Sequence, residues 1–228
     1  ILFIVAISAR QLPFMTTRVI AAEGPTPHHW GSQLKKQIRS ELWAGGFATL
    51  LDALVAASAF SLGVWHYAAP ALLNHLYTFA AMFVGFEIYF YATHRLLHTR
   101  YFYRFHRLHH KSTVTTPFTA LSFSLVERLI LQMGIIGLGA LLSRASPITL
   151  SGVAFYIFFN FVFNILGHFN REVFSKTFAE GILGRLWVTP TFHALHHLRQ
   201  RGHYGLFTQI LDRSFNSYFT DYPEIQKA

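Results

Sequence analysis

Histidines at short, repeated spacings are the residues of this sequence best suited to do chemistry. The chain has 14 histidines against 10 aspartates and glutamates, and a buried imidazole is costly without a partner. On an α-helix, residues three or four apart share a face, so closely spaced histidines can present several ring nitrogens to one or two metal ions. Nine histidines form one H-x-x-x-H pair, two H-x-x-H-H groups and one single site: His94, His98, His106, His109, His110, His168, His193, His196 and His197.

The number of these histidines predicts two metal ions. Imidazole suits zinc, iron, copper and nickel, and a structural zinc site is complete with about four ligands. The sequence contains no E-x-x-H and no H-E-x-x-H segment, which argues against a carboxylate-bridged di-iron bundle and a zinc protease. Cysteine is absent, so thiolate chemistry is excluded. Two histidine-bound irons facing an apolar chamber suit the activation of O₂ and attack on a C–H bond.

Three polar residues are candidates for supporting roles. Asn164 lies one helical turn before His168, and it is predicted to act on the metal through water, to orient a ligand, or to form an interhelical hydrogen bond. Glu87 and Asp212 are predicted either to accept a proton from a ligand histidine or to form structural ion pairs.

Two further features allow competing interpretations. His203 follows the last histidine group by six residues, and it is either an extra ligand or a substitution, of which we favour the substitution. Glu127 and Arg128 interrupt an apolar segment, and we interpret them as an interfacial pair rather than a catalytic one.

Four apolar segments must position these histidines, and they predict an all-α, polytopic membrane protein. Hydrophobic residues make up 52% of the chain and charged residues 13%, whereas a soluble domain carries about a quarter charged residues. Each segment is close to the roughly 20 residues that a helix needs to cross a bilayer. They span about Gly46–Trp65, Leu72–Ala92, Phe118–Leu142 and Ile148–Gly167.

The residues before the first span form a separate expected unit. Residues 1–45 are predicted to be an N-terminal segment in which 34–43 form a basic amphipathic helix on the membrane surface. Residues 46–228 are predicted to be the catalytic domain. The chain begins with Ile1 and not with Met, as expected for a fragment of a longer protein.

The basic residues predict the orientation of the spans. All lysines and arginines except Arg128 and Arg144 lie before the first span, between the second and third, or after the fourth. The positive-inside rule makes this side cytoplasmic, and the net charge of +9 then suits anionic headgroups rather than nucleic acid. His94 ends the second span and His168 ends the fourth, so all nine histidines are predicted to converge in a cytoplasmic helical cap. The expected location is the bacterial inner membrane or the endoplasmic reticulum.

The three histidine groups resemble the histidine boxes of the fatty acid hydroxylase / sterol desaturase superfamily. The resemblance runs from about residue 80 to 220, and its text is EIYFYATHRLLHT, HRLHHKSTVTTPFTALSFSLVE and TPTFHALHHLRQRGHYGLFTQILDRSF. GHFNREVFSK followed by TPTFHALHH is also similar to the hydroxylase-like half of plant wax aldehyde decarbonylases. The sequence departs from the pattern at Ala92, where Trp is frequent, at His203, where Asn is usual, and at 215–217, where F-G-T is usual.

The resemblance implies a non-haem di-iron membrane monooxygenase or desaturase that uses O₂ and a separate electron-donor protein. Its substrate would be a fatty-acyl, sterol or related lipid, hydroxylated or desaturated at a C–H bond. The implied ligands are the eight histidines of the boxes, with His168 as a further one. Aldehyde deformylation or decarbonylation in the same superfamily is the alternative reaction.

Two rivals come from other classes of protein. A membrane b-type cytochrome needs histidine pairs that face each other across the spans, whereas these histidines cluster beyond the span ends. A membrane metal transporter needs polar or acidic residues at the bilayer midplane, and the spans are poor in them.

Overall fold

The structure is a computed structural model, and it describes residues 18–19, 30–112, 114–146 and 148–227. These residues are mostly helical, as predicted. The only strands in the described ranges are β1 (Arg18–Val19) and β2 (Arg171–Glu172), which pair in antiparallel fashion. The long helices are α2 (Trp30–Ser61), α3 (Leu72–Leu97), α5 (Leu125–Ala145) and α6 (Leu150–Gly167).

All four long helices are long and apolar enough to cross a membrane, in α2 from Lys35 onward. This confirms the predicted polytopic membrane fold. Several boundaries differ from the prediction: α2 ends at Ser61 and not at Trp65, and α3 continues past Ala92 to Leu97. Two further differences have a local cause. The amphipathic helix expected at 34–43 is not separate, because no proline interrupts the chain and α2 continues through Gly45 and Gly46. The third span begins at Leu125, because Ser124 caps α5 by accepting a hydrogen bond from the Glu127 amide.

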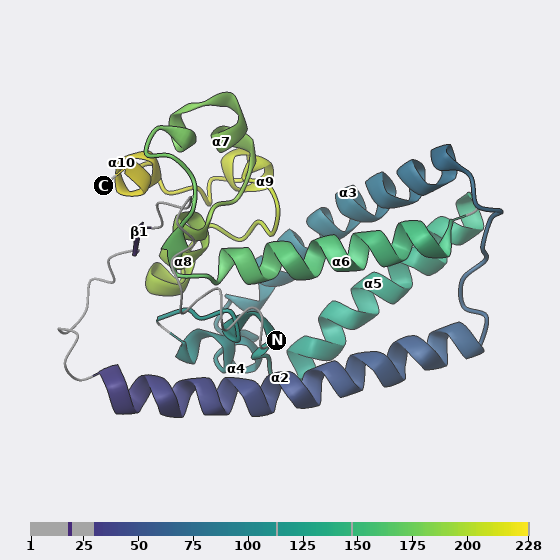
Figure 1. The fold of residues 1–228 in the computed structure, drawn as a ribbon, viewed down its shortest axis with the longest axis horizontal. Helices are drawn as coiled ribbons and strands as arrows, with labels where there is room; N and C mark the ends of the chain where they lie inside the picture. Colours follow the sequence, from purple (N-terminus) through teal and green to yellow (C-terminus); the bar gives the residue numbers. More distant parts are fainter. Residues whose placement is uncertain (1–17, 20–29, 113, 147, 228) are drawn as a thin grey trace, which may run out of the picture.

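The long helices lie side by side along the molecule, as Figure 1 shows. Helix α3 packs against both α5 and α6, and α2 packs against α5. Close approach of α3 and α5 depends on Gly134, where a Cβ atom would lie 2.1 Å from the Tyr89 ring. Buried aromatic side chains such as Phe86 and Tyr156 fill the space between α3 and α6.

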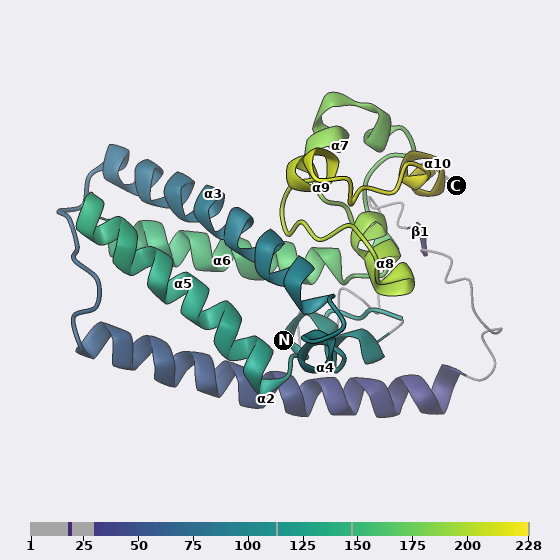
Figure 2. The same cartoon turned by 180° about the vertical axis from the view of Figure 1, so that it is seen from behind.

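The shorter elements gather in a cap at the end of the bundle where α3 and α6 end and α5 begins (Figures 1 and 2). The cap places both H-x-x-H-H groups beside the ends of α3 and α6, which carry the other histidines. Its helical elements are α4 (Tyr103–His106), η2 (His109–Lys111), η3 (Thr119–Leu121), η4 (Phe178–Glu180), α7 (Ile182–Leu186), α8 (Pro190–Arg199), α9 (Ile210–Ser214) and α10 (Tyr222–Lys227).

Candidate metal centre

The structure brings all nine predicted histidines together in two adjacent groups at the junction of bundle and cap. Within each group, one ring nitrogen of every histidine lies within 4.8 Å of the others. The five-histidine group consists of His94, His98, His106, His110 and His196. The four-histidine group consists of His109, His168, His193 and His197.

Each H-x-x-H-H box is divided between the two groups. In the second box His106 and His110 join the five-histidine group, and His109 joins the four-histidine group. In the third box the division is reversed: His193 and His197 share one group and His196 enters the other. The second box passes from α4 into the 3-10 helix η2, whereas the third box lies within α8. Because each box contributes to both groups, the groups lie next to each other, with the His110 and His197 ring centroids 4.7 Å apart.

Hydrogen bonds fix which nitrogen of several rings carries the proton. The Nδ1 atoms of His94, His196 and His168 lie 2.7–2.9 Å from the carbonyl oxygens of Tyr204, Gly202 and Asn164. A carbonyl oxygen only accepts, so each Nδ1 donates, and each Nε2 is left with a free lone pair. In other proteins, a hydrogen bond from the ring nitrogen that does not bind the metal orients a metal-binding histidine in the same way.

The Nε2 atoms then point at one another at distances that suit a shared cation. The Nε2–Nε2 distances are 3.1 Å for His94–His106, 2.9 Å for His106–His110 and 2.9 Å for His168–His193. Facing lone pairs repel unless a cation lies between them. Two imidazoles bound at right angles to one ion, with bonds of about 2.1 Å, would have nitrogens about 3.0 Å apart. The residues present therefore fit a metal ion in each group.

Burial keeps these rings neutral, which is the form that binds a metal. Burial, followed by the neighbouring histidines, lowers the pKa of His98 to about 2 and that of His110 to about 3. Burial also lowers the pKa of His168 to about 4. Both ring nitrogens of His197 are buried without a hydrogen-bond partner among the described residues. This is expected of a side chain that binds a metal.

Glu127 is a functional candidate that the sequence interpretation missed. Its Oε1 lies 2.5 Å from His106 Nδ1, and its side chain is buried. The prediction that Glu127 and Arg128 form an interfacial pair is wrong, because Arg128 instead forms an ion pair with Asp52 of α2. The S-x-x-E pattern at Ser124 was the available signal, because a helix start there places Glu127 in the first turn beside the second histidine box.

Glu87 and Asp212 support the cap rather than a metal-binding histidine directly. Glu87 accepts hydrogen bonds from the amides of Phe207 and Thr208 at 3.0 and 2.9 Å. Asp212 accepts from the amides of Tyr204 and Gly205, both at 2.8 Å. The two carboxylates thus fix residues 204–208, where the Tyr204 carbonyl receives the hydrogen bond from His94.

Asn164 meets the four-histidine group through its backbone. Its carbonyl oxygen accepts the Nδ1 proton of His168 at 2.7 Å. Its side-chain amide donates to the Ala120 carbonyl of η3 at 3.3 Å, which corresponds to the predicted interhelical hydrogen bond. The predicted orienting of a ligand corresponds to the contact of its backbone carbonyl, not its side chain, with His168.

His203 lies outside both groups. Its ring stacks on Phe192 with centroids 3.5 Å apart and an interplanar angle of 5°. Its Nδ1 donates to the Phe192 carbonyl, and its Nε2 accepts from the Phe219 amide. Both nitrogens are therefore engaged in the cap, which favours the substitution over the extra ligand.

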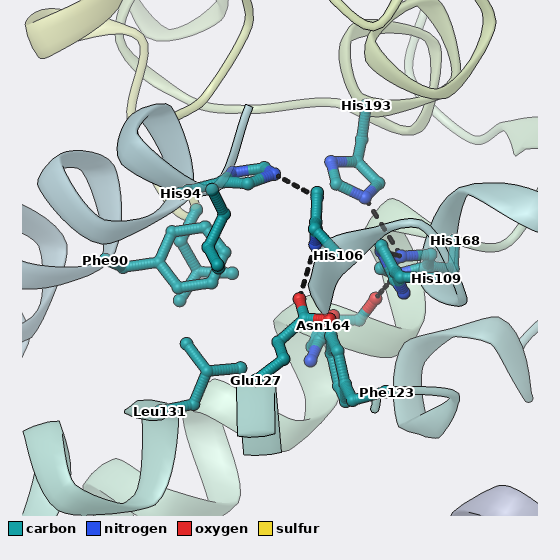
Figure 3. A pocket seen from close by; sticks show the side chains of 12 residues that line it. Phe90, His94, His106, His109, Phe123, Glu127, Leu131, Asn164, His168 and His193 are labelled. Atoms are coloured by element: carbon teal, nitrogen blue, oxygen red, sulfur yellow. Dashed lines mark hydrogen bonds and ion pairs between the residues drawn. The ribbon is translucent and has the colours of Figure 1, made fainter. Parts of the chain in front are cut away.

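A small cavity of about 20 Å³ adjoins the two groups. Figure 3 shows His94, His106, His109, His168 and His193 on its wall, with Phe90 and Leu131 facing them and Glu127 between. Leu97, Phe123, Asn164 and Leu206 complete the lining. The cavity thus lies next to both candidate metal positions, with apolar side chains on the wall that faces the histidines.

Comparison with known proteins agrees with this geometry. The fatty acid hydroxylase family model matches residues 79–217. Very-long-chain aldehyde decarbonylase GL1-6 of Oryza sativa subsp. indica is 35% identical over 133 residues, which cover 55% of this chain and 20% of that protein. Very-long-chain aldehyde decarbonylase CER1 of Arabidopsis thaliana is 35% identical over 132 residues, which cover 55% and 21%.

A third relative matches a longer stretch of this chain. Very-long-chain aldehyde decarbonylase GL1-5 of Oryza sativa subsp. indica is 31% identical over 178 residues, or 75% of this chain and 27% of that protein. The chain thus spans about a fifth to a quarter of the length of these relatives. No solved structure matches it. The family match, which covers more than half of the chain and contains all nine histidines, shows that the chain belongs to the fatty acid hydroxylase family, in the superfamily that includes the sterol desaturases.

Proposed function

We propose that this chain is an O₂-dependent di-iron oxidoreductase that hydroxylates or desaturates a long-chain lipid. The observation that carries the proposal is the pair of adjacent, buried histidine groups at the end of an apolar helical bundle. Two bound iron ions would supply the redox chemistry that activates O₂ against a C–H bond. Histidine donors and an absence of carboxylates within the two groups distinguish this centre from a carboxylate-bridged one.

The protein's own residues would hold and orient the centre. The backbone carbonyls of Gly202, Tyr204 and Asn164 fix the rings of His196, His94 and His168 through their Nδ1 protons. Glu127 accepts the Nδ1 proton of His106 and makes that imidazole a stronger donor toward the metal. The apolar side chains beside the histidines, such as Phe90 and Leu131, would keep water away from the centre.

A very-long-chain aldehyde is the second candidate substrate. The names of the curated relatives, at about 35% identity, describe very-long-chain aldehyde decarbonylases. The same histidine groups would serve an aldehyde whose carbonyl carbon lies beside them, so this reaction fits the site at least as well as hydroxylation does.

The membrane and a redox partner complete the proposal. Oxidation of a C–H bond by O₂ consumes two electrons, so we expect a separate electron-donor protein. The bundle would lie in the bacterial inner membrane or the endoplasmic reticulum, with the cap on the cytoplasmic side. The metal transporter rival is disfavoured because the nine histidines of the two groups lie at or beyond the ends of α3 and α6 and in the cap, instead of along the bundle.

The reaction can be tested with purified, iron-reconstituted protein, a chemical reductant and ¹⁸O₂. Fatty acid, fatty aldehyde and sterol substrates are supplied separately, and products are identified by mass spectrometry. An ¹⁸O-labelled alcohol or a new double bond supports hydroxylation or desaturation. A hydrocarbon one carbon shorter than the aldehyde supports the second candidate. Turnover by His196→Ala equal to that of the wild type would contradict both.

A further inference from the structure

We propose that Glu41 of α2 is a positioning residue for the four-histidine group, an inference that rests on the proposed metal centre. Helix α2 lies before the region that the family model matches. Glu41 is nevertheless 2% exposed, and a buried carboxylate is unfavourable unless hydrogen bonds compensate for the lost water. Its bonding partners show what it holds.

The carboxylate of Glu41 accepts three hydrogen bonds from one distant segment. The hydroxyl groups of Ser112 and Thr116 donate to it at 2.6 Å, and that of Thr119 at 2.8 Å. A fourth bond comes from Gln37 on the same helix at 2.8 Å. The three hydroxyl donors lie 71 to 78 residues after Glu41 in the chain. Glu41 therefore fixes the segment 112–119 against α2.

The segment is connected to His109 at its start and through the residues that follow it. The Ser112 amide donates to the His109 carbonyl at 3.3 Å. At the other end, η3 leads to Ser122, whose carbonyl accepts from His109 Nδ1 at 3.3 Å. The His109 ring also stacks on Phe123, with centroids 4.8 Å apart. Displacement of the segment would therefore move this ring.

The same segment reaches a second member of the group. The Ala120 carbonyl, next to Thr119, accepts a hydrogen bond from the Asn164 side chain, and the Asn164 backbone carbonyl holds His168 Nδ1. His109 and His168 contact each other directly, with their Nε2 atoms 3.2 Å apart. Glu41 is thus linked to two of the four histidines, although it touches neither.

Helix α2 is itself anchored close to the centre, which makes it a suitable support. Asp52, three turns after Glu41, accepts a hydrogen bond from Arg128 Nε at 2.8 Å and a second one from Arg128 Nη2. Arg128 follows Glu127, the partner of His106. The position of Glu41 is therefore fixed relative to α5 as well as to the segment 112–119.

The experiment titrates metal-free protein in detergent with Co²⁺ and follows the visible absorption. Glu41→Ala removes the acceptor, Glu41→Gln keeps one carbonyl oxygen, and Glu180→Ala removes an exposed carboxylate of the cap as the matched control. We expect two Co²⁺ sites in the wild type and in Glu180→Ala. In Glu41→Ala one site should bind Co²⁺ at least tenfold more weakly, with an altered absorption spectrum. Loss of the hydrogen bonds that support metal ligands has an effect of this size in other metalloproteins. Glu41→Gln should restore part of the affinity.

The outcomes separate this inference from the proposed function. Wild-type affinity and spectrum at both sites in Glu41→Ala would overturn the role of Glu41 and leave the metal centre standing. If the wild type binds no Co²⁺, the metal centre fails, and this inference fails with it. If circular dichroism shows that Glu41→Ala does not fold, Ser112→Ala and Thr116→Val decide, because each removes one of the hydrogen bonds to Glu41. Unchanged Co²⁺ binding in both would overturn the inference.

Discussion

The Nδ1 atom of His106 lies 2.5 Å from Oε1 of Glu127, and both side chains are 2% exposed. This contact joins the second histidine box to the first turn of α5. It also directs the other ring nitrogen, Nε2, toward His94 and His110, at 3.1 and 2.9 Å. The five-histidine group therefore depends on a carboxylate that is not itself a member of it.

Removal of this carboxylate is expected to weaken metal binding at the five-histidine group. Glu127→Leu leaves His106 without its acceptor, and affinity for iron should fall by about 10- to 100-fold. Glu127→Gln keeps a neutral acceptor and should lie between the two, because hydrogen bonds to a charged acceptor are stronger. Competition with a chelator of known affinity measures the change. Equal affinities in the wild type and Glu127→Leu would show that the contact has no part in metal binding.

His203 is expected to stabilise the cap without binding a metal. His203→Ala removes a stacked ring and two hydrogen bonds, which should lower the free energy of unfolding by on the order of 3 kcal/mol. The folded variant should still bind two metal ions. Thermal unfolding and metal analysis on the same sample check both statements, with His196→Ala as the comparison that loses metal. Loss of one metal ion from folded His203→Ala would identify His203 as a ligand.

The same residue gives a prediction about pH. Burial lowers the pKa of His203 from 6.5 to about 3. Between these values the unfolded chain binds a proton that the folded chain does not, so stability falls as the pH falls. The contribution of neutral His203 is complete above about pH 6.5 and decreases by at most about 1.4 kcal/mol per pH unit toward pH 3.

The variant His203→Asn isolates this effect, because Asn tolerates the positive φ of 57° and does not titrate. The stability advantage of the wild type over this variant should shrink between pH 7 and pH 5. The measurement is the difference in melting temperature at each pH, and a difference independent of pH would argue against a neutral, buried His203.

The ion pair between Asp52 and Arg128 is expected to be strongly coupled. The two side chains lie in helices able to span the membrane, and they are 19% and 18% exposed. Asp52→Ala leaves the arginine without its partner and should cost about 3–5 kcal/mol. The double variant Asp52→Leu/Arg128→Leu should recover most of this loss, since it buries no unpaired charge. Melting temperatures in detergent test the cycle, and additive effects would contradict the coupling.

The sequence predicted the histidines that meet because two simple rules determine their positions. Helical spacing places His94 near His98, and an even number of spans returns His168 to the end of the bundle that His94 occupies. The division of each box between two groups did not follow from these rules. Whether His109 joins the same histidine group as His106 depends on how the backbone runs through the cap, where His109 begins the short 3-10 helix η2.

The supporting carboxylates were harder to predict than the histidines. Glu127 was interpreted as interfacial because its neighbour Arg128 offered an obvious partner, and its true contact depends on where α5 begins. Glu41 lies in a segment interpreted as a surface helix, and the three hydroxyl groups that donate hydrogen bonds to it are more than 70 residues away. Contacts of this kind are set by tertiary packing, and local patterns in a single sequence do not encode them.

The central claim is that the two histidine groups bind two iron ions, and the iron content of the purified protein tests it most directly. Iron-reconstituted wild type and His75→Ala, whose imidazole contacts Thr149 at the opposite end of the bundle, should both contain about two irons per chain. His193→Ala and His196→Ala, one from each group, should each lose iron while remaining folded. One iron or none in the wild type, or two irons in both group variants, would contradict the claim.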